Sequence, residues 1–312
     1  MRKRRFQVLF CNVLATAMLC CSAVTFSQEK VLLPYESVLT QASRRSGLVG
    51  RVLNDQQGNL YVVGSYDDNN FNQFGQILEL SPPPKQFPST WRSQSIVSMQ
   101  GPVSGLVMDK GGRMYGTAGG GTGFGYVFQL VPSGGQWVQN ILYNFKGGSD
   151  ASVPTSTLTL DDVGDIYGAS LYGPIFQLKP PAPGSSAWKE SVIYGFQNTV
   201  GVYSVLGLTV DKHGNVFGAT SCFFNNLPDI VFELHPPGSS GAWTEETLYT
   251  FPASPYLSCG GEVVPTFDSA GNLYGTRAGQ IVKEQWLDNG YVYQLSPPST
   301  SGGQWTFSTL YA

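Results

Sequence analysis

The sequence predicts an all-β protein, a β-propeller of about five four-stranded blades. A unit of about 50 residues recurs five times along the chain, which is the period of propeller blades. Glycine and proline are plentiful, at 38 and 20 of 312 residues, as expected of a fold with many turns. Outside the N-terminus, no long stretch spaces its apolar residues as a helix does.

The N-terminus has the pattern of a secretory signal peptide, residues 1–27. Four basic residues, Arg2 to Arg5, precede an apolar run from Val8 to Ala23, and small residues follow before Gln28. A signal anchor that stays in the membrane is the alternative. We expect residues 28–312 to form a single propeller domain that is secreted, periplasmic or at the cell surface. No membrane span is expected after signal removal.

Charge limits the partners that the mature chain can have. Four of the 18 basic residues and none of the 21 acidic residues lie in the signal, so its removal leaves a net charge of −7. Nucleic acids and anionic lipids both need clustered Lys and Arg, and no basic cluster follows Arg44 and Arg45. Nucleic acid is therefore not an expected partner.

The repeated unit begins with a hairpin between its first two strands. Its motif is Asp, two variable residues and Gly, followed by an apolar and an aromatic residue, at steps of 50 to 57 residues. The Asp carboxylate can bond to backbone N–H groups, and Gly supplies the positive φ that a tight turn needs. The structural turns are therefore Asp55 and Gly58, Asp109 and Gly112, Asp161 and Gly164, Asp211 and Gly214, and Asp268 and Gly271.

The rest of each unit predicts two more strands. A strand ending in Leu and Pro comes next, and proline ends the ladder because it has no N–H to donate. A strand that begins with Trp closes the unit, and five of the six Trp occupy that position. These segments place the blades at about 42–100, 101–152, 153–202, 203–260 and 261–312.

How the ring closes is left open by the sequence. Residues 35–41, YESVLTQ, resemble the end of a Trp strand and could complete the last blade. The last blade nevertheless has its own Trp strand at 305–312. The N-terminal strand either adds to an edge or is a spare strand.

The units resemble the Gloeo/Verruco (GloVer) tandem repeat of exported bacterial proteins. The best matches are Gly105–Thr117 with Gly125–Pro132 and Trp137–Phe145. The first unit departs most, since Val62 and Val63 stand where Gly and Thr are usual. The resemblance covers nearly all of the mature chain. It implies a secreted or surface protein of propeller-like fold and implies no activity.

Cysteine usage agrees with export. Three of the five cysteines lie in the signal, which leaves Cys222 and Cys259. An oxidising compartment favours a disulfide between these two, and two separate buried thiols are the alternative.

Catalytic and metal motifs are weak. The two histidines, His213 in a turn and His235 at the end of a strand, are read as surface residues because no nucleophile motif accompanies them. No cofactor is expected. Calcium is the inorganic alternative, at "DDNN" (67–70) or "DDVGD" (161–165), but the turn uses two of the latter's positions and Ca²⁺ wants 6–8 oxygens.

An enzyme of the glycosidase or lyase type is one alternative function, and a purely structural envelope protein is another. Glycosidases need two carboxylates beside a cleft. The five turn aspartates lie near the ends of the first strands, but turn chemistry already explains them. A catalytic pair would instead break the repeat.

Binding is the preferred function, with a glycan or a surface protein as the partner. Segments that depart from the repeat are 65–74, 221–229, 255–261 and 277–289. Three of these connect the second and third strands and so belong on one face, where loops carry function. Their aromatic residues among Asn and Asp suit glycan or protein contacts. The candidate binding residues are Tyr66, Phe71, Phe74, Phe223, Phe224 and Trp286.

Overall fold

The computed structural model describes residues 46–312, except 68–72, 84–90, 121–122, 172–173, 197–201, 224–227, 239–240, 253–264, 278–280, 283–284, 287–289 and 301. Some strand residues next to these gaps are described by their backbone alone. The chain divides into two compact units, 1–32 and 33–312, and every described strand lies in the second. The predicted signal peptide and residues 35–41 lie outside the described residues.

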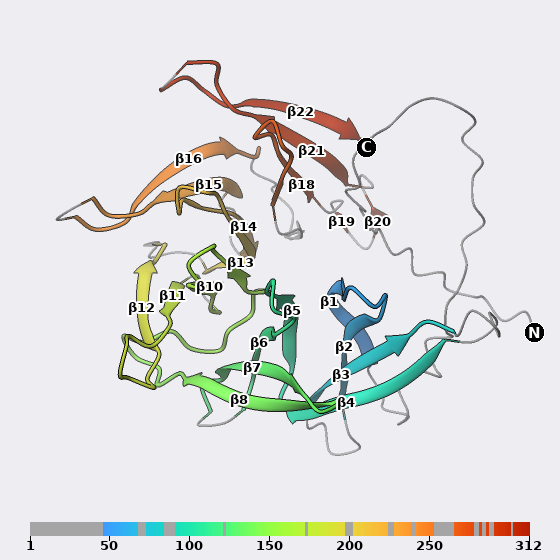
Figure 1. Ribbon diagram of the computed structural model, residues 1–312. Helices are drawn as coiled ribbons and strands as arrows, with labels where there is room; N and C mark the ends of the chain where they lie inside the picture. The colour runs from blue at the N-terminus through green and yellow to red at the C-terminus, as the bar shows by residue number, and fades with distance from the viewer. Residues whose placement is uncertain are drawn as a thin grey trace, which may run out of the picture. The chain divides into compact units, whose positions relative to one another are not determined.

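The predicted all-β class is confirmed, with five four-stranded antiparallel sheets. Each sheet is built by one consecutive stretch of chain, which Figure 1 shows as a continuous run of colour. No helix long and apolar enough to cross a membrane occurs in the part of the chain that is described.

The strands of the first three sheets follow one another without crossovers. Sheet one contains β1 (Ser46–Asn54), β2 (Leu60–Asp67), β3 (Gln73–Ser81) and β4 (Arg92–Gln100). Sheet two contains β5 (Val103–Met108), β6 (Met114–Ala118), β7 (Tyr126–Ser133) and β8 (Gln136–Asn144). Sheet three contains β9 (Thr159–Leu160), β10 (Ile166–Ala169), β11 (Ile175–Lys179) and β12 (Lys189–Tyr194).

The last two sheets have the same order, and the fifth has an insertion. Sheet four contains β13 (Val202–Val210), β14 (Val216–Phe223), β15 (Ile230–His235) and β16 (Thr244–Thr250). Sheet five contains β17 (Thr266–Phe267), β18 (Leu273–Arg277), β21 (Tyr291–Ser296) and β22 (Thr306–Tyr311). A separate two-stranded ladder, β19 (Ile281–Val282) and β20 (Gln285–Trp286), lies between β18 and β21 in the chain.

Hydrophobic clusters join each sheet to the next one along the chain. Four clusters link sheets one and two, two and three, three and four, and four and five. The tryptophan at the start of an outer strand packs edge-on against an aromatic ring of the preceding sheet. The ring centroids lie 5.6 Å apart for Trp137 and Tyr61, and 6.4 Å apart for Trp243 and Tyr167. Among the described residues, no core cluster joins sheet five to sheet one.

A glycine in the second strand makes room for a ring in the third. Gly116 lies opposite Phe128, and a Cβ on that glycine would overlap the ring. Sheets three to five repeat this arrangement. Sheet one differs because Val62 lies opposite the smaller Leu78, and both are buried. In this unit a larger side chain in the second strand is thus compensated by a smaller one in the third.

The hairpin turns have one geometry in all five units. In each, the Gly N–H donates to the Asp carbonyl, and the Gly adopts a φ between +77° and +93°. The Asp Oδ1 accepts two backbone N–H groups, from two and four residues ahead, at 2.8–3.1 Å. Such a turn followed by a left-handed residue is a common hairpin connection with a built-in bulge.

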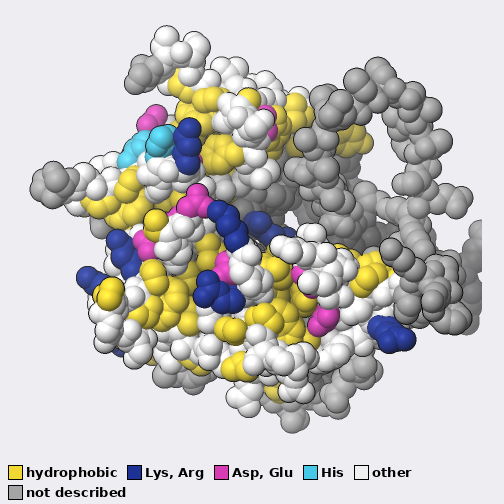
Figure 2. All heavy atoms as spheres, in the orientation of Figure 1, with side chains coloured by type: hydrophobic (Ala, Val, Ile, Leu, Met, Phe, Trp, Pro, Cys, Tyr) yellow, Lys and Arg dark blue, Asp and Glu magenta, His cyan; other side chains and the backbone are white. Residues whose placement is uncertain are grey.

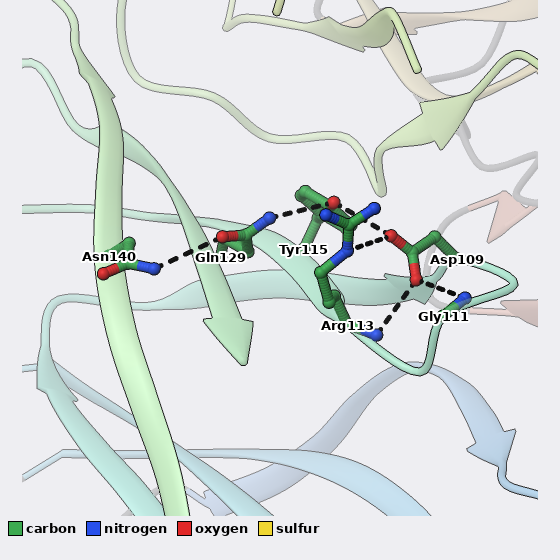
Figure 3. A network of polar contacts seen from close by, with 6 residues as sticks. All are labelled: Asp109, Gly111, Arg113, Tyr115, Gln129 and Asn140. Carbon is green, nitrogen blue, oxygen red and sulfur yellow. Dashed lines mark hydrogen bonds and ion pairs between the residues drawn. The ribbon is translucent and has the colours of Figure 1, made fainter. Parts of the chain in front are cut away.

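A chain of polar side chains extends from the turn across the sheet, and Figure 3 shows it in sheet two. The Tyr115 hydroxyl donates a hydrogen bond to Asp109 at 3.0 Å, and the Gln129 amide donates one to Tyr115 at 2.9 Å. The Asn140 amide donates one to Gln129 at 3.3 Å. We call this chain the transverse row. Burial alone would raise the pKa of Asp109, but the bonds from Arg113 and Tyr115 hold it below its ordinary value.

Replacing Asp109 with alanine should destabilise the protein, because backbone N–H groups and Tyr115 would lose a charged acceptor. We expect a loss of about 1–3 kcal/mol in the free energy of unfolding, measured by urea denaturation. Asp162→Ala is the matched control, because its ion pair with Lys110 joins two side chains that are 80% and 94% exposed. Equal losses for the two variants would contradict the role assigned to the turn.

Candidate functional site

The fifth position, counted from the first residue of the second strand, is occupied by a small residue in four of the five units. These residues are Gly64, Ala118, Ser170 and Thr220, and all four are buried. The fifth unit has Arg277 at this position, directly opposite Tyr291 in the register of β18 and β21. A long cation thus replaces a small buried side chain at the end of the strand where the divergent connection begins.

A second departure lies where the third-strand segment begins in the sequence, five residues before the leucine near its end. Four units have glycine there, at positions 75, 125, 173 and 290, and the fourth unit has Asp229. Asp229 is the last residue of the divergent connection 221–229, and it is 6% exposed. The two departures therefore place opposite charges on neighbouring sheets, four and five.

Arg277 and Asp229 form a buried ion pair. Arg277 Nη2 lies 3.9 Å from Asp229 Oδ2, and the two side chains are 10% and 7% exposed. The guanidinium also lies over the Phe251 ring, 5.0 Å from its centroid, and Nη1 donates to the Tyr291 hydroxyl at 3.4 Å. The Asp229 carbonyl accepts a hydrogen bond from the Phe251 N–H at 2.9 Å, which holds the loop end against the residue that follows β16.

The buried pair carries a desolvation cost in free energy, and the other units form the same strands without such a pair. Removing two charges from water is expensive, and a separation of 3.9 Å is longer than a charge-assisted hydrogen bond. Of the ion pairs between described residues, it alone has both side chains less than one-eighth exposed. Arg277 carries five N–H donors, and its contacts with described residues do not use all of them. We therefore take this pair as the candidate functional site.

The predicted binding residues are only partly described. Tyr66 and Phe74 lie directly opposite each other in β2 and β3, and the side chain of Phe74 is half-buried. Phe223 ends β14 and Trp286 ends β20, where the backbone alone is described. Phe71, Phe224 and Cys259 lie outside the described residues. So does the side chain of Cys222, which leaves the predicted disulfide a prediction.

Sequence analysis placed Arg277 and Asp229 in divergent segments without singling them out. The signal that finds them is the comparison of equivalent strand positions, where charge replaces Gly or another small residue. Aromatic content drew attention to the loop interiors instead. The charges at the strand ends carry more structural information, because their environment can be compared across five copies.

The carboxylates of the calcium alternative already have protein partners. Asp161 accepts Val163 N–H, Asp165 N–H and the Tyr167 hydroxyl, the last at 3.2 Å. Asp162 pairs with Lys110, and Asp165 accepts Gln177 at 2.8 Å. The acidic stretch 161–165 thus has the bonding of a hairpin. Most of the other stretch, 67–70, lies outside the described residues.

A carboxyl pair links sheets two and three. Asp150, after β8, accepts the Tyr143 hydroxyl at 3.0 Å and the Lys146 N–H at 2.8 Å through Oδ2. Its Oδ1 and the Glu190 Oε1 of β12 are buried acceptors without a donor among the described residues. Burial and the hydrogen bond to Asp150 raise the pKa of Glu190 to about 7. A proton held on Glu190 satisfies both acceptors.

Comparisons with known proteins show the fold and no family. No family model and no curated protein matches the chain. A crystal structure described as a candidate 6-phosphogluconolactonase from Bacteroides uniformis is similar over 83% of this chain and 69% of its own, with a TM-score of 0.52 and 15% identity. That likeness supports an all-β fold of the same general kind.

Two further solved structures are similar at lower scores. One is an ulvan lyase of a new polysaccharide lyase family, at 10% identity over 82% of this chain and 69% of its own, with a TM-score of 0.45. The other is an α-L-arabinofuranosidase from Clostridium thermocellum, at 10% identity over 89% of this chain and 97% of its own, with a TM-score of 0.44. At these scores the likeness assigns no function.

Single replacements of the buried pair should cost more than the double replacement. Arg277→Thr or Asp229→Gly each leaves one buried charge unpaired, at about 3–5 kcal/mol of unfolding free energy. The double variant installs residues found at these positions in other units, so we expect it to recover most of that loss. Urea denaturation of the four proteins measures the coupling, and additive losses would contradict the ion pair.

The Glu190 pair should make stability fall as pH rises. The folded-state pKa, about 7, lies above the ordinary value of 4.5, so the stabilisation is complete below pH 4.5 and is lost as pH rises through 7. Glu190→Gln keeps a hydrogen-bond donor at every pH, so the urea midpoint should change less between pH 5 and pH 8 than it does in the wild type. Glu245→Gln, the equivalent glutamate of the next unit, is the control. An unchanged slope in Glu190→Gln would refute the shared proton.

Proposed function

We propose that the chain is an exported binding module that recognises a glycan at the loop end of sheets four and five, around Arg277 and Asp229. The observation that carries this proposal is the buried ion pair, which replaces small residues of the repeat at one place in the molecule. Folding does not require the pair, because the other units make the same strands without it. We infer that the pair is kept at this position for recognition.

The chemistry of the pair fits sugar hydroxyl groups. A guanidinium donates and a carboxylate accepts, so together they can bind two neighbouring hydroxyls of one sugar ring. Because each charge neutralises the other, the pair favours a neutral saccharide over an acidic one. Tyr291 adds a half-buried ring beside the guanidinium. Phe223, Phe224 and Trp286 occupy the same two connections in the sequence and offer faces on which sugars stack.

The surface charge agrees with an uncharged ligand. On the face of the molecule that Figure 2 draws, basic and acidic side chains form small mixed groups, without a continuous basic area over the described residues. Such a surface lacks the clustered cations that nucleic acids and anionic membranes require. A surface protein remains the second partner class, since polar and aromatic loop residues also suit protein contacts.

A glycosidase or lyase is the alternative enzyme function. It needs a second carboxylate beside Asp229 at the same end of the strands. The turn aspartates do not supply one, because each binds backbone N–H groups of its own hairpin. Asp229 itself is held by Arg277. A purely structural envelope role is the third candidate, in which the pair would only fasten sheets four and five.

The finer fold and the cellular setting are part of the proposal. We propose that the five sheets are blades of one closed ring, with Trp91 of sheet one on Tyr274 of sheet five. The contacts of Trp137, Trp243 and Trp305 with the preceding sheet support this. The signal pattern and the GloVer-like motifs support an exported protein that acts in the periplasm, at the surface or outside the cell.

A glycan array with purified residues 28–312 tests the function. We expect binding to a restricted set of neutral saccharides, and a loss of about tenfold or more in affinity for the Asp229→Gly/Arg277→Thr double variant, measured by calorimetry. The double variant is useful because it should remain folded. His213→Ala, in a distant turn, is the control and should bind as the wild type does.

Three outcomes would contradict the proposal in different ways. Full affinity in the folded double variant would show that the glycan binds away from the ion pair. No saccharide bound by the wild type, with a protein captured at the same face and lost in the double variant, would replace the glycan by a protein partner. If the protein bound neither a saccharide nor a protein, the ion pair would have only a structural role.

A further inference from the structure

The transverse row is rebuilt in sheet four. At the position of Tyr115, Tyr61, Tyr167 and Tyr274, this sheet has Phe217, which has no hydroxyl to donate to the turn aspartate. At the position of Gln129, it has Glu233. The next residue of the row, directly across from Glu233 on β16, is Glu246. Sheet four therefore has carboxylates at both outer positions of the row.

The equivalent pair in the other sheets never contains two acids. The pairs are Glu79 and Gln94, Gln129 and Asn140, Gln177 and Ser191, and Gln294 and Ser308. Like charges directly opposite each other across antiparallel strands are destabilising. Glu233 is also 8% exposed, so its charge is largely removed from water. This arrangement calls for a nearby cation.

His235 lies between the two glutamates. It follows Glu233 by two residues on β15 and so shares its face. Its Nδ1 lies 3.4 Å from Glu233 Oε1, and its Nε2 lies 3.2 Å from Glu246 Oε2. Each residue can offer one ligand atom such that the three lie within 4.8 Å of one another. Figure 2 shows histidine side chains at the surface over sheet four, next to acidic ones.

Histidine alone does not balance the charge of this cluster. A histidine side chain supplies at most one positive charge, and only in its protonated form. Among the described residues, His235 is the cation within ion-pair distance of these glutamates. A divalent ion would neutralise both carboxylates at once and leave the imidazole neutral.

We propose that Glu233, His235 and Glu246 bind one divalent transition-metal ion of the Zn²⁺ type. One imidazole nitrogen and two carboxylate oxygens are a donor set that Zn²⁺ accepts, with a water as the fourth ligand. Tetrahedral ligands at the usual zinc distances are about 3.3 Å apart. With one nitrogen taken from His235, the three ligand atoms lie within 4.8 Å of one another, so small side-chain rotations would bring them around one ion. Glu246 and His235 are 54% and 37% exposed, so an ion and its water can enter from solvent.

The donor set disfavours calcium at this place. Calcium wants six to eight oxygens, whereas this cluster offers a nitrogen and few carboxylate oxygens. The site also differs from the glycan site in position, since it lies on the outer strands β15 and β16 of sheet four. Its failure or success therefore leaves the proposed glycan binding untouched.

Calorimetric titration of metal-free, untagged protein with Zn²⁺ tests the proposal. We expect one ion per chain, a rise in melting temperature on binding, and weaker binding as pH falls and the ligands gain protons. Ca²⁺ at the same concentration should give no such rise. His235→Ala and Glu233→Gln should each weaken Zn²⁺ binding about tenfold or more.

The variants include controls for folding and for other ligands. Glu233→Gln installs the glutamine of three other units, so it should fold, and it should be more stable than the metal-free wild type at pH 8. His213→Ala removes the other histidine and should bind Zn²⁺ normally. Co²⁺ in place of Zn²⁺ should give a spectrum without a thiolate charge-transfer band.

Three results would overturn the proposal. They are no Zn²⁺ bound by the wild type, equal binding by His235→Ala and the wild type, and a Co²⁺ spectrum with a thiolate band. The last result would place the ion on Cys222 or Cys259 instead.

Discussion

The hydrogen bonds of the turn aspartate are the interaction on which the rest of the structure depends. One carboxylate holds the hairpin closed through two backbone N–H groups, and in four units it also holds the tyrosine of the second strand. In sheets two and three the tyrosine continues the row to the third strand, which helps to set the register of the inner strands. With the register set, the glycine of the second strand meets the ring of the third, and the core between sheets can close.

Because this framework is common to all five units, departures from it can be interpreted one by one. Val62 opposite Leu78 exchanges volume and keeps the core filled. Asp229 with Arg277 adds a buried charge pair, and Glu233 with Glu246 puts two acids at row positions that hold at most one acid in the other sheets. The first departure preserves packing. The other two cost stability, which is why they direct attention to binding.

Sequence patterns predicted the strands well, because a unit present in five copies averages out the ambiguity of any single strand. The turn aspartates could be predicted because their chemistry is local, within six residues of one hairpin. Arg277 and Asp229 could not be paired from the sequence, since 47 residues and a change of sheet separate them. His235 was interpreted as a surface residue because no nucleophile motif accompanies it in the sequence. Its partner Glu246 lies on the next strand. Cross-strand register was the missing information.

The construction of each sheet from one consecutive segment bears on how such a chain can change over time. A unit carries all four of its strands and makes its hydrogen-bonded ladders without borrowing from a neighbour. Recombination between two aspartate–glycine turns would therefore add or delete a whole unit in frame, with the inter-sheet tryptophan contact regenerated at the new junction. The charged residues of the fourth and fifth units would be inherited as a block. Gene duplication could thus multiply the scaffold while leaving a single copy of the specialised surface.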